Sequence, residues 1–145
     1  MEEIAYHYQT GFSLKEEKKH TDWIIRVIEG YGRKTGELSF IYVSDEVILQ
    51  MNQEYLAHDF YTDIITFGYP ELEGLSGDLF ISTDRVTENA GQMNCSIESE
   101  MRRVMVHGVL HLLGFQDKSA KETRIMRELE DAALKLFHVK HSSDV

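Results

Sequence analysis

The chain has few of the features that mark extracellular or membrane proteins. It contains a single cysteine, Cys95, which excludes an internal disulfide and fits a reducing compartment. No apolar run approaches the roughly 20 residues that a helix needs to cross a bilayer. The chain starts Met1-Glu2-Glu3-Ile4, with acids where a signal peptide has basic residues before an apolar segment. We therefore expect a cytoplasmic protein that has no membrane partner.

Proline is also scarce, and no stretch has the composition of a linker. The only proline, Pro70, falls in an expected loop, and the sequence contains no repeat and no low-complexity tract. With 145 residues, of which 42% are hydrophobic, the chain is long enough for one substantial core and short for two. We expect a single domain over residues 1–145.

Basic residues are in the minority. The 15 Lys and Arg residues stand against 25 Asp and Glu residues, so the formal net charge is −10. Such a charge opposes diffuse attraction to phosphate backbones, and a nucleic-acid ligand would need a local basic patch. For any single candidate, an ordinary solvated helix face is the simpler interpretation. The candidates are Arg85, Arg102, Arg103, Lys118, Lys121, Arg124 and Arg127.

Hydrophobic periodicity and capping residues predict four strands and five helices. The expected strands, rich in β-branched and aromatic residues, span 4–8, 37–43, 62–67 and 78–83. The expected helices span 14–30, 45–56, 84–93, 97–113 and 119–136, with suitable N-caps at Ser44, Ser96 and Ser119. This mixture predicts an α+β fold in which about five helices cover a small, mixed four-stranded sheet. The order of the strands is not predicted.

The most informative feature is a pair of histidines, His107 and His111, followed by Asp117. Histidines four residues apart lie on one face of a helix, so both rings can reach a single ion. Gly114 suits the end of that helix, after which the chain can turn back and bring Asp117 to the same ion. Three protein ligands and an open fourth position are typical of a catalytic zinc site. The alternative is a pair of hydrogen-bonded histidines in a buried helix.

Gly108 follows the first of these histidines. Zinc proteases of the His-Glu-x-x-His type carry their general base at this position, so a standard peptidase mechanism is disfavoured. A glycine here instead permits close approach of the backbone to the ion or to a neighbouring strand.

Three segments occur in a fixed order: Thr62–Phe67 (TDIITF), Gly77–Ser82 (GDLFIS) and His107–Phe115 (HGVLHLLGF). Together with Asn52 and Tyr55, they resemble the YbeY family of ribosomal RNA maturation factors over about residues 36–117. Members of this family are described as metal-dependent endoribonucleases specific for single strands. The resemblance implies a zinc-hydrolase-like α+β domain that binds one Zn²⁺. It further implies maturation of the 3′ end of small-subunit ribosomal RNA, a role in ribosome biogenesis and quality control, and contact with small-subunit ribosomal proteins.

The resemblance assigns His107 and His111 as the first two ligands and places Asp117 where the family has its third histidine. An aspartate oxygen binds zinc, but this harder ligand also makes Mn²⁺ or another divalent ion credible. Gln116 replaces the aspartate that usually precedes the third ligand.

A second departure concerns the arginine that the family commonly carries directly after the tyrosine of its Asn-x-x-Tyr segment. That position is Leu56 here, which cannot attract phosphate. His58 and Arg85 are candidates to replace the arginine. Asp63 is interpreted as a turn residue or a catalytic group, and Asp78 as a candidate to orient a ligand histidine through its ring N–H.

The sequence thus predicts metal-assisted phosphodiester hydrolysis at His107, His111 and Asp117. One alternative is a metal hydrolase with a peptide or small-molecule substrate and with Asp63 or Asp78 as its base. The other is a non-enzymatic ribosome-assembly factor whose metal stabilises the fold and whose basic helices bind RNA or a ribosomal protein. Leu56 and the acidic net charge favour this second alternative.

Overall fold

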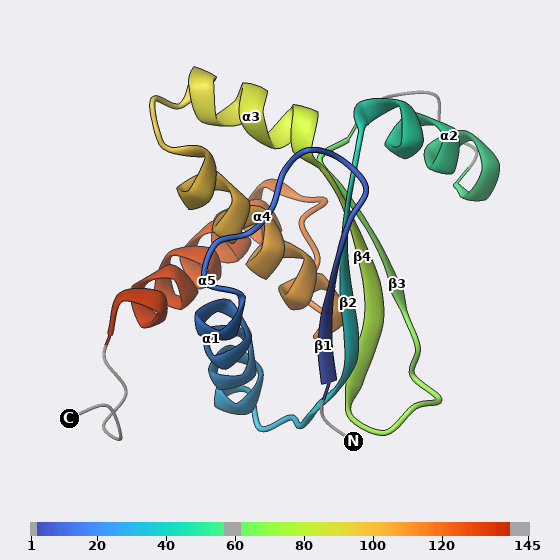
Figure 1. Cartoon of the computed structure of the whole chain (residues 1–145). Coiled ribbons are helices and arrows are strands. Elements are labelled where there is room, and N and C mark those ends of the chain that lie inside the picture. Colours follow the sequence, from blue (N-terminus) through green and yellow to red (C-terminus); the bar gives the residue numbers. More distant parts are fainter. Residues whose placement is uncertain (1–2, 57–61, 140–145) are drawn as a thin grey trace.

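A computed structural model describes residues 3–56 and 62–139 of the chain, which form a sheet covered by helices (Figure 1). The strands are β1 (Glu3–Tyr8), β2 (Thr35–Val43), β3 (Ile64–Gly68) and β4 (Leu75–Ser82). The helices in these described ranges are α1 (Glu17–Gly30), α2 (Asp45–Tyr55), α3 (Thr83–Gln92), α4 (Ile97–Leu112) and α5 (Ala120–His138). The predicted α+β class, with a mixed four-stranded sheet, is confirmed.

The sheet has the order β1-β2-β4-β3. The pairs β1/β2 and β2/β4 are parallel, whereas β3 runs antiparallel to β4 and occupies one edge. Strands β2 and β4 begin earlier than predicted, because their pairing continues past a register shift to Thr35 and Leu75. Strand β3 begins two residues later than predicted, at Ile64.

Helices α1, α4 and α5 lie on the same side of the sheet (Figure 1). Their buried side chains form one hydrophobic cluster with the inner residues of the strands, including Trp23, Phe40, Leu79, Met105 and Phe137. The other face carries a smaller cluster in which Ile48 of α2 packs with residues of β2 and β3. Helix α4 is therefore held between the sheet and the outer helices, and this fixes the position of the residues along it.

Three predicted N-caps are present. The side chains of Ser44, Ser96 and Ser119 accept hydrogen bonds from the first turns of α2, α4 and α5. At Ser119 the cap is reciprocal, because Glu122 also accepts a hydrogen bond from the Ser119 backbone. Helix α1 begins at Glu17, three residues later than predicted, after Glu16 in a left-handed conformation. In the ranges that the structure describes, no helix combines the length and the apolar character of a membrane span.

Helix α4 lies close against the sheet at Gly108. A Cβ atom at this position would lie 2.5 Å from Ile64 Cδ1 and 2.6 Å from Leu79 Cδ2. The absence of a side chain therefore lets the backbone of α4 settle onto β3 and β4. His107 and His111, which precede and follow Gly108 in the sequence, are thereby held beside the edge strand β3.

Candidate metal centre

The side chains of His107, His111 and Asp117 meet beside the end of α4. The Nε2 atoms of the two histidines are 3.0 Å apart. Asp117 Oδ2 lies 3.2 Å from His107 Nε2 and 3.5 Å from His111 Nε2. One ligand atom from each residue thus falls within 4.8 Å of the others, a grouping that can hold a metal ion. Two imidazole nitrogens and a carboxylate oxygen suit Zn²⁺ and related divalent ions.

A short turn brings the aspartate back to the helix. Gly114, with a φ of 110°, follows the end of α4, and its N–H donates to the His111 carbonyl at 2.9 Å. The Thr123 hydroxyl of α5 donates to the Asp117 carbonyl at 3.0 Å. The aspartate is therefore tied both to the end of α4 and to the first turn of α5.

A buried carboxylate, Glu130 of α5, supports the first histidine from behind. Its Oε2 is 2.6 Å from His107 Nδ1, and its Oε1 accepts a hydrogen bond of 2.8 Å from Arg103. Glu130 is only 5% exposed. A proton held on Nδ1 by this carboxylate leaves Nε2 as the atom that faces His111 and Asp117.

The pKa values of this pair shift apart. Burial opposes the charge of Glu130, but hydrogen bonds from His107 and Arg103 outweigh burial and lower the pKa of the carboxyl. Burial likewise opposes the charge of His107, but the hydrogen bond and charge of Glu130, with smaller contributions from Asp117 and Asp63, raise the pKa of the imidazole. Both pKa shifts therefore favour the charged form of the group concerned, the ionised carboxylate of Glu130 and the protonated imidazole of His107.

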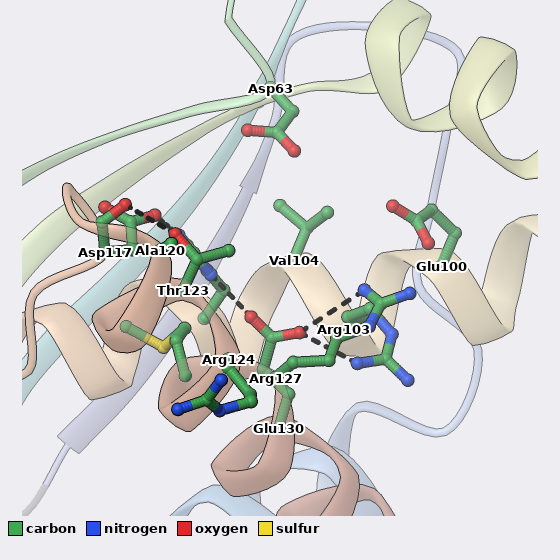
Figure 2. Close-up of a pocket in the computed structure, with 12 residues that line it drawn as sticks. Asp63, Glu100, Arg103, Val104, Asp117, Ala120, Thr123, Arg124, Arg127 and Glu130 are labelled. Atoms are coloured by element: carbon green, nitrogen blue, oxygen red, sulfur yellow. Dashed lines mark hydrogen bonds and ion pairs between the residues drawn. The ribbon is translucent and has the colours of Figure 1, made fainter.

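Two pockets meet at the candidate metal centre. The smaller, of about 390 Å³, runs along β3 and is lined by residues that include Asn52, Leu56, Thr62, Ile65 and Thr66. The larger, of about 700 Å³, lies between α4 and α5 (Figure 2). His107, Asp117 and Asp63 line both pockets. A ligand can therefore extend to either side of the three candidate ligands.

Among the further predicted candidates that lie within residues 3–56 and 62–139, Asp63 is the one that the structure brings to the centre. Burial raises the pKa of its carboxyl, while the charge of His107 acts in the opposite direction. Asp78 lines neither pocket, and its carboxylate accepts a hydrogen bond of 2.5 Å from the Tyr69 hydroxyl. The hydrogen bond to a candidate ligand histidine that was expected from Asp78 is made by Glu130 instead.

Of the two candidates for replacing the family arginine, Arg85 is the one among the described residues, and it lines neither pocket. Arg85 makes ion pairs with Asp45 at 3.1 Å and with Glu88 at 2.8 Å, at the starts of α2 and α3. His58 lies outside the described residues. Leu56 itself lines the smaller pocket and is 42% exposed, so this wall carries an apolar side chain where the family commonly has a cation.

The basic residues divide into two groups. Arg103, Arg124 and Arg127 line the larger pocket. Arg103 is engaged closely by Glu130 at 2.8 Å and by Asp131 at 2.7 Å, whereas the more exposed Arg127 makes a longer ion pair with Glu130 at 3.7 Å. The other predicted candidates on α4 and α5 do not line it; Arg102, for example, lies over the Phe137 ring at 4.3 Å. The positive charge that faces this pocket therefore comes mainly from Arg124 and Arg127.

A family model described as Endoribonuclease YbeY matches residues 5–138 of the chain. The chain belongs to the YbeY endoribonuclease family. Relatives named Endoribonuclease YbeY include one from Parabacteroides distasonis, 49% identical over 136 residues, which cover 92% of this chain and 95% of the relative. Another, from Flavobacterium psychrophilum, is 42% identical over 139 residues, covering 96% of this chain and 99% of the relative. The expected family membership is thereby confirmed.

The fold of this chain is also similar to that of a solved structure. The solution structure of a Thermotoga maritima protein superposes with a TM-score of 0.64 and 26% sequence identity. The similarity covers 93% of this chain and 89% of that protein.

Glu130 and Glu100 are pocket residues that the sequence reasoning missed. Glu130 lies on the buried face of α5 with Met126, Ala133 and Phe137, and Glu100 lies on the buried face of α4. An acid inside an otherwise apolar helical stripe is a signal that could have identified both, since carboxylates are rarely buried without a partner.

Proposed function

We propose that this chain is a metal-dependent endoribonuclease that hydrolyses single-stranded RNA in the cytoplasm, with ribosomal RNA as its substrate. Its reaction would contribute to maturation of the 3′ end of small-subunit ribosomal RNA and to ribosome biogenesis and quality control, in contact with small-subunit ribosomal proteins. The observation that carries the proposal is the group of His107, His111 and Asp117 at the junction of two pockets. The endoribonuclease name of the relatives supports the choice of RNA as substrate.

The three side chains would hold one Zn²⁺, with Mn²⁺ as the alternative, through the two Nε2 atoms and Asp117 Oδ2. When bound, such an ion polarises a phosphate oxygen and lowers the pKa of a coordinated water. Glu130 keeps His107 in the tautomer that presents Nε2. Asp63, whose pKa is raised by burial, lines both pockets, and this supports a role for it in exchanging a proton with the substrate.

The arrangement of the pockets supports a single strand over a duplex. A strand that passes from the smaller to the larger pocket would place one phosphodiester beside His107 and its neighbouring nucleotides on either side. Bases enter pockets of this kind when they are unstacked, as they are in single-stranded loops and ends. Arg124 and Arg127 supply the local positive charge that the acidic chain otherwise lacks.

A nuclease assay with a matched histidine control tests this proposal. We expect the metal-loaded protein to cleave single-stranded RNA and to spare duplex RNA, with cleavage abolished by His111→Ala and by a chelator. His7→Ala, on the exposed side of β1, should cleave like the native protein. Equal cleavage by the native chain and His111→Ala would overturn the proposal.

A non-enzymatic assembly factor is the second candidate. Leu56 in the position of the family arginine favours it, because this side chain lines the smaller pocket without contributing charge. Under this alternative the protein would bind one ion and bind RNA, but it would leave the RNA intact. The same assay, combined with metal analysis and a binding measurement, separates the two functions.

A further inference from the structure

The larger pocket contains a buried acid that the proposed metal chemistry does not use. Glu100 is 6% exposed, and its Oε1 has no hydrogen-bond partner among residues 3–56 and 62–139. Figure 2 shows its carboxyl group pointing toward the same space as that of Asp63, above the Val104 side chain. Because an unpaired buried carboxylate is costly, this group suits a ligand that donates hydrogen bonds.

The remaining walls of the pocket suit a flat, partly apolar ligand. Val104 and Met126 line it and are themselves buried, and Ala120 adds a small apolar side chain. Arg124 and Arg127 line the side formed by α5. The volume of about 700 Å³ is in the range of pockets that hold small organic ligands. Apolar walls, a hydrogen-bond acceptor and cations together match a nucleotide.

We propose that this pocket binds the base of a nucleotide next to the cleaved phosphodiester, and that Glu100 recognises guanine. Cleavage of the neighbouring phosphodiester rests on the proposed function, whereas recognition of the base rests on the pocket alone. Arg124 and Arg127 then face the phosphate of the same nucleotide, and Val104 and Met126 contact the plane of the base.

The choice of guanine follows from the hydrogen-bonding groups of the bases. An ionised carboxylate only accepts hydrogen bonds, and guanine presents two adjacent donors, N1–H and the N2 amino group, on one edge. Adenine and cytosine place a ring-nitrogen acceptor beside their single amino group, and uracil places its N–H between two carbonyl oxygens. Guanine is therefore the base that a carboxylate can bind through both oxygens without meeting an acceptor.

The electrostatics of the pocket agree with this assignment. Burial, and secondly the charge of Asp63, raise the pKa of Glu100, while Arg103 and Arg127 act in the opposite direction. The carboxylate thus lacks the stabilisation that water would provide. Two N–H donors from a base would supply that stabilisation, and a base with an acceptor at the same position would not.

The test compares GMP, IMP, AMP and UMP as probes of the whole, metal-loaded protein. None of the four contains an internucleotide bond, and all share the phosphate, so differences in affinity report on the base. We expect GMP to bind about ten-fold more tightly than AMP and UMP. IMP, which lacks the N2 amino group, should fall between them. Binding is measured by calorimetry or by nuclear magnetic resonance titration.

The variant Glu100→Gln keeps the shape of the side chain and replaces one acceptor oxygen by an amide donor. It should remove the preference for GMP, whereas Glu98→Gln, an exposed acid on the same helix, should preserve it. Thermal unfolding of both variants should show an intact fold. Equal binding of all four nucleotides by the native protein, or a GMP preference that survives Glu100→Gln, would overturn the proposal.

Cleavage assays separate this proposal from the proposed function. A GMP preference that depends on Glu100, in a protein that cuts no RNA, would sustain the base pocket and contradict the endoribonuclease. RNA cleavage without any GMP preference would contradict the base pocket alone. If both proposals hold, RNA with one guanosine in a uridine tract is cut beside the guanosine, and Glu100→Gln makes the cuts uniform.

Discussion

At the scale of single residues, the pairing of His107 with Glu130 decides which ring nitrogen of His107 faces the candidate metal position. The carboxylate holds a proton on Nδ1, and this fixes both the tautomer and the rotation of the ring. Arg103 in turn compensates the charge of Glu130 at 2.8 Å. The nitrogen that faces the candidate metal position is thus oriented by groups on two helices.

Glu130→Gln tests this orientation. The amide oxygen can still accept a hydrogen bond from Nδ1, but the negative charge is lost, so we expect metal affinity to fall about 10- to 100-fold. Competition with a chromogenic chelator measures the affinity. Glu128→Gln, an exposed acid one half-turn away on α5, is the control and should bind metal like the native chain. Unchanged metal affinity in Glu130→Gln would mean that the Glu130 carboxylate does not affect how His107 binds the metal.

At the scale of elements, the contact of α4 with the sheet sets where the histidines stand. Gly108 lets the helix approach Ile64 of β3 and Leu79 of β4. The cap at Ser119 and the hydrogen bond from Thr123 to the Asp117 carbonyl then place the third candidate ligand. The geometry of the centre therefore depends on a helix packing distance and on the start of the next helix.

Gly108→Ala should destabilise the protein by about 1 kcal/mol, although alanine favours helices. The new Cβ would overpack Ile64 and Leu79, at a cost of about 1–3 kcal/mol, against a gain of about 1 kcal/mol in helix propensity. Gly91→Ala in α3 is the matched control, because no atom from outside its own stretch of helix lies within 4 Å of its Cβ position, and this variant should gain stability. Chemical denaturation measures both, and a similar gain in the two variants would refute the close approach.

At the scale of the whole molecule, a chain with a formal net charge of −10 has to hold RNA through a small basic region. Arg124 and Arg127 line the larger pocket; Arg103 is closely paired with Glu130 and Asp131, and Arg127 makes a longer ion pair with Glu130 at 3.7 Å. The acidic remainder of the surface should repel a polyanion and limit non-specific association.

We therefore expect only a shallow dependence of RNA affinity on salt. With about two or three phosphate contacts, the slope of log affinity against log salt should be about −2 for a single strand. Arg127→Gln should reduce the magnitude of that slope by roughly 0.7, whereas Lys135→Gln, exposed near the end of α5, should leave it unchanged. Fluorescence anisotropy across a salt series gives the slope. A steep slope in the native protein would contradict binding of RNA through only a few basic residues.

Much of the architecture could be predicted because it depends on local rules. Caps at Ser44, Ser96 and Ser119 mark the starts of three helices, and apolar periodicity marks the elements themselves. The ends of helices and strands were predicted less accurately where tertiary contacts extend them. Strand β4, for example, begins at Leu75 because it pairs with the early part of β2. Strand order could not be predicted, since it depends on pairing between segments far apart in the sequence.

The sequence by itself determined the two candidate histidine ligands, the return of the chain after Gly114 and the family. Helix geometry alone places His107 and His111 on one face, and an ordered set of motifs identifies relatives. Only the tertiary structure decided that Glu130 supports His107, that Asp78 pairs with Tyr69, and that Glu100 faces a pocket. These relations depend on how helices and strands pack, because a side chain's partner across the core is set by the distance and rotation of whole elements.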